Sequence, residues 1–286
     1  MRALVGDRGF LVALIAQLLT MFIETNGPGR SMPERGTVPR SYDVFRRGLW
    51  TTTTGHVIEE AYVSIFVNGQ ELVTIMATPR QQEYLAVGYL LTEGIITHRD
   101  DLLDVSVAPN QTCVDVWLKK ELALPQRRIL TSGCGKGTTF DTLSPHLPPL
   151  VSNLRMTHGQ LVDRLGELQE QAQLYRRARG VHAAGLATQS ALTMWTEDAG
   201  RHNTLDKLAG RCLLEEIDPS GHVLLTSGRI SSDMISKVRR MNIPLVASRT
   251  SPTSLSVLWA ERWNITIVGY LRPDRMHVYT HPERLR

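Results

Sequence analysis

Short apolar runs and amphipathic segments alternate along the second half of the chain, and this alternation restricts the possible folds more than any other feature. The apolar runs are typical of buried strands, and the intervening segments carry apolar residues at helical spacing. We expect strands at residues 183–187 and 191–195, which form a hairpin, and at residues 222–226, 243–247 and 265–270. We expect helices at residues 203–216, 231–241 and 254–263. Strands that alternate with helices indicate an α/β layered domain, and we expect its strands to be mainly parallel.

The first half of the chain predicts a smaller α+β unit. Residues 58–68 and 70–76 alternate in polarity around Asn68-Gly69, a pair typical of a tight hairpin turn. Thr78 and Pro79 suit the N-cap and the first position of a helix that ends at Gly94. Two further strands are expected near residues 103–108 and 112–119.

A linker-like stretch at residues 145–149 separates this unit from a long helix expected over residues 158–179, capped by Thr157. The chain therefore divides into three predicted parts. These are an N-terminal extension and arm (1–55), expected to be disordered, a small α+β domain (56–150) and an α/β domain (151–286).

The composition excludes several classes of protein. The chain has 286 residues, of which 42% are hydrophobic, and a net charge of +4, which is too small to indicate a nucleic-acid binder. Its three cysteines form no disulfide framework and no zinc-ligand pattern, which favours a reducing compartment. The apolar run at residues 10–23 is too short for a membrane span. We expect residues 1–31 to be a dispensable extension upstream of Met32; a secretion signal is the alternative.

A single cysteine stands in the glycine-rich stretch Thr131-Ser-Gly-Cys-Gly-Lys-Gly137. The glycines on either side leave the Cys134 thiol uncrowded and let a large substrate approach the backbone. Lys136 favours the thiolate, which is the nucleophilic form of cysteine. Cys134 is therefore the candidate nucleophile, while Cys113 and Cys212 lie in runs typical of a core.

Two predicted joints between a strand and a helix share hydroxyl groups and an arginine, in residues 226–232 and 248–254. Helix N-termini attract phosphate, and arginine offers a fork that matches its oxygens. We expect an anion site there, with Arg229, Ser231, Arg249 and Ser251 as ligands, and a tenfold weaker binding of GDP when either arginine becomes alanine. Arg201 and His202 belong to a third polar segment that suits contact with a polar ligand.

Five ordered blocks of the sequence resemble the FdhD family of formate dehydrogenase accessory sulfurtransferases. The blocks are Gly180-Val-His-Ala-Ala184, Glu197-Asp-Ala-Gly-Arg-His-Asn203 with Asp206-Lys207, Ser227-Gly-Arg-Ile-Ser-Ser232, Ala247-Ser-Arg-Thr-Ser-Pro-Thr-Ser254 and Val278-Tyr-Thr-His-Pro-Glu-Arg284. The resemblance covers roughly residues 55–286. It implies a cytidine-deaminase-like α/β/α layered C-terminal domain, without zinc, because His182 is followed by Ala-Ala and no Pro-Cys-x-x-Cys occurs.

The resemblance also implies a function. A member of this family takes persulfide sulfur from a cysteine desulfurase and passes it to the molybdenum bis(molybdopterin guanine dinucleotide) cofactor of formate dehydrogenase. The resemblance further implies a cytoplasmic protein, expected to be a homodimer, with no nucleic acid or membrane as partner. Cys134 matches the persulfide-carrying cysteine of the family. A cofactor contact falls on Tyr270, Leu271, Arg272, Pro273, Asp274 and Arg275.

One departure from the family pattern leaves alternatives open. Many members have two cysteines at this loop, and Gly137 stands in place of the second one. This departure argues against a mechanism that needs two thiols, and it leaves a single-cysteine persulfide relay intact. The alternatives are a non-catalytic molybdenum-cofactor chaperone and a cysteine hydrolase, which requires His182 or His202 beside Cys134.

Overall fold

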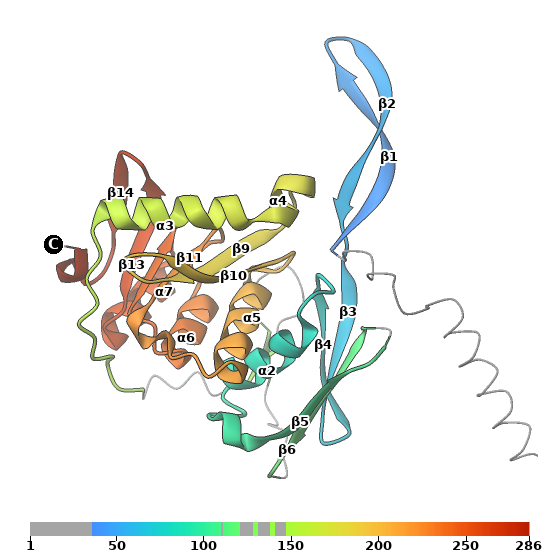
Figure 1. Cartoon of the computed structure of the whole chain (residues 1–286). Coiled ribbons are helices and arrows are strands. Elements are labelled where there is room, and N and C mark those ends of the chain that lie inside the picture. The colour runs from blue at the N-terminus through green and yellow to red at the C-terminus, as the bar shows by residue number, and fades with distance from the viewer. Residues whose placement is uncertain (1–35, 110, 121–127, 131–137, 141–146, 286) are drawn as a thin grey trace, which may run out of the picture. The chain divides into compact units, whose positions relative to one another are not determined.

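The computed structural model describes residues 36–109, 111–120, 128–130, 138–140 and 147–285 (Figure 1). Residues 36–286 form one compact unit. The predicted division at residue 150 stays a prediction. Within this unit, the two main sheets are joined by a close contact between two helices. No helix in the described ranges is long and apolar enough to cross a membrane. The apolar run at residues 10–23 lies outside those ranges.

A six-stranded sheet occupies the second half of the chain, with strand order β10-β9-β11-β12-β13-β14. Its strands are β9 (His182–Ala187), β10 (Leu192–Asp198), β11 (Val223–Thr226), β12 (Leu245–Ser248), β13 (Thr266–Arg272) and β14 (Arg275–Val278). Only β11, β12 and β13 are parallel to one another. The prediction of mainly parallel strands is therefore wrong, because β9 and β10 form a hairpin antiparallel to β11 and the unpredicted β14 folds back on β13.

Helices cover both faces of this sheet, which gives the predicted α/β/α layering (Figure 1). One face packs against α5 (Arg201–Leu214), α6 (Ser232–Arg240) and α7 (Ser254–Trp263). The other face packs against α3 (His158–Gln171), whose Leu161, Leu165 and Leu168 enter the core. Thr157 caps α3 as predicted. The helix breaks at Ala172, and a separate short helix, α4 (Gln173–Ala178), follows, so the single helix over 158–179 is wrong.

The first half forms a four-stranded sheet of order β4-β3-β6-β5 with α2 (Gln82–Thr92) packed on one face. Its strands are β3 (Ala61–Val67), β4 (Gln70–Ala77), β5 (Leu102–Val107) and β6 (Cys113–Leu118). The Asn68-Gly69 turn and the helix end near Gly94 are as predicted. The helix start is wrong, because the Thr78 hydroxyl accepts the Ala199 N–H at 3.1 Å instead of capping α2, which begins after Gln81.

Helices α2 and α5 cross at backbone distance, and two glycines make this possible. A Cβ on Gly88 would lie 1.6 Å from the Asp206 carbonyl oxygen, and one on Gly210 would lie 2.0 Å from that of Tyr84. No side chain fits in either place. The two halves of the chain are therefore joined along a glycine-to-glycine crossing.

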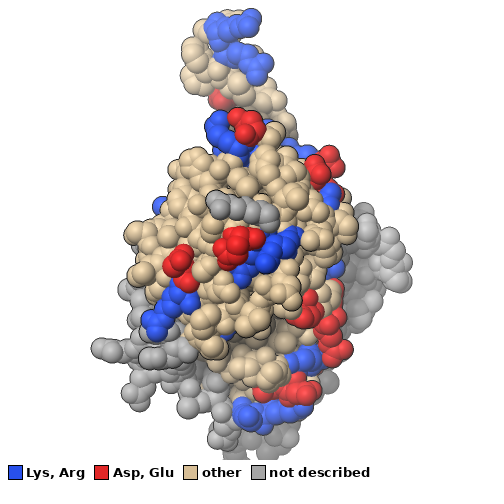
Figure 2. Space-filling model, turned by 90° about the vertical axis from the view of Figure 1, so that its left-hand side faces the viewer, with Lys and Arg blue, Asp and Glu red and all other residues tan. Residues whose placement is uncertain are grey.

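Residues predicted to be disordered form a long hairpin instead. Strands β1 (Thr37–Arg46) and β2 (Leu49–Ile58) pair over their whole length and extend away from the two sheets (Figure 1). The prediction is thus wrong for residues 37–55, because ten cross-strand pairs and a tight turn at Arg47-Gly48 order them. Figure 2 shows Lys and Arg atoms at the outer end of this hairpin and mixed charges over the body below it.

Strands β7 (Arg128–Leu130) and β8 (Thr138–Phe140) pair antiparallel, with Leu130 opposite Thr138. The seven residues between them include Cys134, which lies outside the described residues. Three short 3-10 helices complete the described structure: η1 (Arg99–Asp101), η2 (Pro219–Gly221) and η3 (Pro282–Leu285).

Candidate functional site

A cavity of about 650 Å³ lies between the α3–α4 layer and the carboxyl ends of the parallel strands. The joints after β11 and β12 form its floor with Ser227, Arg249 and Thr250, and Arg272 at the end of β13 joins them. Carboxyl ends of parallel strands are where ligands commonly bind in α/β sheets. This cavity is therefore the candidate functional site.

Hydrogen bonds lock the two joints together. The Gly228 carbonyl accepts both the Ser248 hydroxyl at 2.7 Å and the Thr250 hydroxyl at 2.8 Å. The Ile230 N–H donates to the Ser251 carbonyl at 3.2 Å, so the loops run side by side as predicted. These hydroxyl groups hold the backbone in shape. The polar atoms left to meet a ligand in the cavity are mainly those of the arginines.

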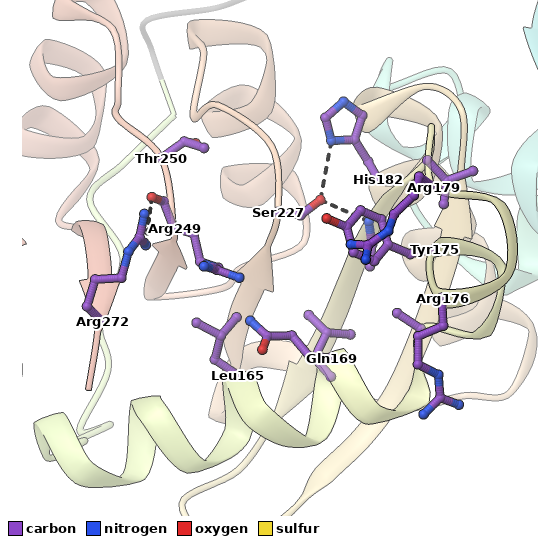
Figure 3. A pocket seen from close by; sticks show the side chains of 14 residues that line it. Leu165, Gln169, Tyr175, Arg176, Arg179, His182, Ser227, Arg249, Thr250 and Arg272 are labelled. Carbon is purple, nitrogen blue, oxygen red and sulfur yellow. Dashed lines mark hydrogen bonds between the residues drawn. The ribbon is translucent and has the colours of Figure 1, made fainter. Parts of the chain in front are cut away.

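Four arginines line the cavity, and no aspartate or glutamate does so among the described residues. Arg249 extends from the end of β12 toward Gln169 of α3 (Figure 3). The Arg272 guanidinium donates to the Arg249 backbone carbonyl at 3.0 Å, which fixes the Arg272 side chain beside the end of β12. Arg176 and Arg179 stand on the opposite side, and the Arg179 guanidinium lies 4.8 Å from the ring centre of Tyr175. Such a site suits a ligand that carries several negative charges.

Glu197 positions α4, the wall of the cavity whose arginines were not among the ligands predicted from the sequence. Its carboxylate accepts the backbone N–H groups of Leu174 and Tyr175 at 2.9 and 2.8 Å, at the start of α4. A carboxylate is favourable at a helix N-terminus, where N–H groups lack partners. The sequence signal for this wall is the Arg-Arg-Ala-Arg run at residues 176–179, which we interpreted only as the end of a helix.

Two histidines lie beside the first joint. The His182 Nδ1 lies 3.3 Å from the Ser227 hydroxyl, and both residues line the cavity. Burial, and then the charge of Arg201, lower the pKa of His182, so the ring is neutral near pH 7. The His202 Nε2 lies 3.4 Å from the Ser231 hydroxyl, which caps α6. Burial and the charges of Lys237, Arg201 and His182 lower the pKa of His202 to about 3.

Much of the segment predicted to contact a polar ligand is buried between the two halves. Asp198 accepts the Thr78 N–H at 3.1 Å and the Lys207 ammonium at 2.6 Å, while Asn203 donates to the Met76 carbonyl at 2.9 Å. Lys237 of α6 binds Asp206, Thr92 and Glu93 at 2.7, 2.8 and 3.2 Å. We call these groups the buried junction: Thr78, Thr92, Glu93, Asp198, Asn203, Asp206, Lys207 and Lys237. Its role is to join the halves.

The remaining predicted ligands are scattered. Arg229 is exposed and lies outside the cavity lining, and Arg201 packs against Gly228, where a Cβ would approach the Arg201 Cβ to 3.0 Å. Leu271 is fully buried in the core, so its side chain reaches no ligand. Of the other contacts predicted in the β13–β14 region, Tyr270, Pro273, Asp274 and Arg275 are exposed. Within the described ranges, no three His, Cys, Asp or Glu side chains gather closely enough to hold a metal ion.

Comparison with known proteins places the chain in a family. The model of the FdhD/NarQ family matches residues 58–286, and the chain therefore belongs to this family. The "Sulfur carrier protein FdhD" of Bacillus pumilus is 33% identical over 247 residues, covering 84% of this chain and 94% of that protein. The protein of the same name from Staphylococcus aureus is 32% identical, covering 84% and 93%.

A solved structure has the same fold. The crystal structure of a protein from Desulfotalea psychrophila, described as a formate dehydrogenase accessory protein, superimposes with a TM-score of 0.75. The two chains are 27% identical, and the match covers 88% of this chain and all of the other. The β1–β2 hairpin precedes residue 58, where the match to the family model begins.

Proposed function

We propose that this chain is a sulfur carrier that serves formate dehydrogenase. The observation that carries the proposal is family membership, because relatives named sulfur carrier protein align over 84% of the chain. A carrier needs an uncrowded nucleophilic cysteine, and Cys134 between two glycines is the candidate. Sulfur loading needs a reduced thiol, which is the usual state in the cytoplasm, so we place the reaction there.

The first step is a thiolate exchange at the sulfur donor. The Cys134 thiolate attacks the terminal sulfur of a persulfide on a cysteine desulfurase, the donor S–S bond breaks, and the donor cysteine leaves as a thiolate. Electrons balance without an added oxidant, because one persulfide replaces another. Lys136 stabilises the resulting persulfide anion. Later release of the sulfur as sulfide takes two electrons, which a thiol reductant of the cell supplies.

The cargo that receives the sulfur is the molybdenum bis(molybdopterin guanine dinucleotide) cofactor. Its two dinucleotides carry pyrophosphates, and the four arginines of the cavity offer guanidinium forks for them. The cavity of about 650 Å³ holds one nucleotide arm, in the size range usual for small-ligand sites. Arg249 and Arg272 bind from the sheet side, and Arg176 and Arg179 from α4. Gln169 and Tyr175 orient the rest of the ligand.

A cofactor chaperone without sulfur chemistry is the second candidate, and the cavity itself supports it. Gly137 stands where a dithiol mechanism needs its second cysteine, while the cavity offers four arginines to a charged cofactor. The hydrolase alternative requires a histidine at Cys134, which lies outside the described residues. We further expect a homodimer.

Replacement of Cys134 by serine tests the proposal. In a strain that lacks the native gene, Cys134→Ser should abolish formate dehydrogenase activity and leave the carrier folded. Cys113→Ser is the matched control, and Cys212→Ser a second one, since burial raises the pKa of Cys212 to about 12 and keeps it unreactive. Mass spectrometry after incubation with a desulfurase should show one added sulfur on the wild type and on both control variants, and none on Cys134→Ser. Full formate dehydrogenase activity with Cys134→Ser would exclude the sulfur-carrier role and leave the cofactor-chaperone role.

A further inference from the structure

The outer end of the β1–β2 hairpin carries a group of exposed apolar side chains. Leu49 and Trp50 are each 71% exposed, Phe45 is 58% exposed and Tyr42 is 47% exposed. Isolated exposed apolar residues are ordinary, but a group of four at one end of a projecting element is typical of an interaction site. We call residues 42–50 the tip.

The tip has a preset shape. Arg47 and Gly48 both have positive φ, of 51° and 84°, which is the pattern of a type I′ turn, the turn that matches the twist of paired strands. The rings of Phe45 and Trp50 face each other across the strands with centres 5.1 Å apart. The Tyr42 ring covers Gly55, where a Cβ would lie 2.6 Å from the hydroxyl oxygen. A partner that binds the tip therefore does not have to order it.

The chemistry of the tip indicates an acidic groove on a protein. Trp, Tyr and Arg are the residues that most often dominate binding energy at protein interfaces. Residues 37–58 carry three arginines (40, 46 and 47) against one acid, Asp43, which gives a net charge of +2. Phe45 and Trp50 lie on one face of the hairpin, and Tyr42 and Leu49 on the other. A partner that covers both faces needs a groove, and a single flat surface does not suffice.

The root of the hairpin lies against the wall of the arginine cavity. His56 of β2 and Arg177 of α4 are in hydrogen-bond contact, with their side-chain nitrogens 3.3 Å apart. Gly36, just before β1, lies against Leu174 of α4, and the same helix supplies Tyr175 and Arg176 to the cavity. Ten residues per strand span about 33 Å. A partner held by the tip is therefore about 33 Å from the cavity wall, a distance that a large protein can span, which favours the protein that receives the cavity's ligand.

We propose that the tip is a docking arm for an acidic groove of the formate dehydrogenase that this chain serves. The inference rests on the proposed function and names the surface that the carrier uses for its client. Docking at the tip leaves the cavity free, so client binding and nucleotide binding are separable properties of the chain.

Binding of the full chain to purified formate dehydrogenase without its cofactor tests the proposal. Phe45→Ser with Trp50→Ser should weaken binding by about tenfold or more, as loss of a hot-spot pair does. Arg46→Glu with Arg47→Glu should slow association and abolish its decrease between about 50 and about 300 mM NaCl. The matched controls are Leu255→Ser with Leu258→Ser and Arg99→Glu with Arg262→Glu, which change exposed residues elsewhere and should keep binding within about twofold.

Each other outcome overturns the proposal in a recognisable way. Equal affinity of tip variants and wild type would remove the arm from client binding but leave the sulfur-carrier function, which the Cys134→Ser variant tests by itself. A dimer that becomes a monomer only in the tip variants, by light scattering, would make the tip a contact between two copies. Tip-dependent flotation with phosphatidylglycerol vesicles, without client binding, would make it a lipid contact.

Discussion

Charged side chains gather at the buried junction and at the arginine cavity, and the two places are built differently. In the junction each lysine has an acid as partner, with Lys207 at 2.6 Å from Asp198 and Lys237 at 2.7 Å from Asp206. In the cavity four arginines share one space with no acidic side chain among the described lining residues. A charge removed from water needs a partner, whereas a charge that faces an open cavity does not. The difference separates a structural ion pair from a site prepared for a ligand.

The pKa values of the two lysines in the junction are shifted in opposite directions. Burial lowers the pKa of Lys207, and the single carboxylate of Asp198 does not fully oppose that effect. Burial also acts on Lys237, but Asp206 and Glu93 together outweigh it, and the pKa of Lys237 is raised. The number of carboxylates in contact, one at Lys207 and two at Lys237, therefore determines whether the lysine pKa is lowered or raised. Hydrogen bonds also hold both side chains in place, since the Lys207 Nζ donates to the Thr78 carbonyl and the Lys237 Nζ to the Thr92 hydroxyl.

The largest effect is expected from breaking the junction. Lys207→Met leaves the Asp198 carboxylate buried without its cation, and this should lower the free energy of unfolding by about 3–5 kcal/mol. Urea unfolding followed by circular dichroism measures the change. Arg211→Met is the matched control, because it removes an exposed helical ion pair with Glu215 and should cost less than about 1 kcal/mol. Equal losses in both variants would contradict the distinction between the two kinds of charge.

A smaller effect on stability, but a clear one on binding, is expected in the cavity. Arg249→Ala should weaken GDP binding about tenfold, since a hydrogen bond to a charged group contributes about 1.5–3 kcal/mol. Its free energy of unfolding should change by less than about 0.5 kcal/mol, as for other surface changes. Arg229→Ala is now the control, because Arg229 lies outside the cavity lining. Calorimetric titration measures GDP binding by the two variants. Equal weakening by both would contradict the cavity as the GDP site and favour the exposed side of the joints, where Arg229 lies.

A third effect depends on pH and concerns His202, which has Arg201 and Lys237 as cationic neighbours. Its pKa of about 3 in the folded chain lies below the ordinary 6.5, so below about pH 6.5 the unfolded chain binds a proton that the folded chain does not. Stability is therefore lost as the pH falls from about 6.5 toward 3. Between about pH 7 and pH 5 the wild type should lose about 2 kcal/mol more than His202→Gln. His277→Gln, which changes an exposed histidine, should behave as the wild type does.

Local patterns predicted most of the elements, and long-range contacts account for the errors. Thr157 capped its helix because the cap is made within the next turn. Thr78 did not, because Asp198 and Ala199, 120 and 121 residues away, bind its backbone and side chain. In the candidate site, Arg249 was predicted as a ligand and lines the cavity, because it directly follows a strand that the sequence pattern shows. Arg176 and Arg179 were missed because only the break at Ala172 and the carboxylate of Glu197 turn α4 toward the cavity.

The glycine crossing of α2 and α5 also sets an order of events during synthesis. Gly88 and Gly210 are 122 positions apart, so at about 5–20 residues per second α2 leaves the ribosome about 6–24 s before its partner glycine. In that interval Thr92 and Glu93 lack the lysine that later binds them. The first half of the chain therefore waits, with Thr92 and Glu93 exposed to water, until the second half arrives to cover them.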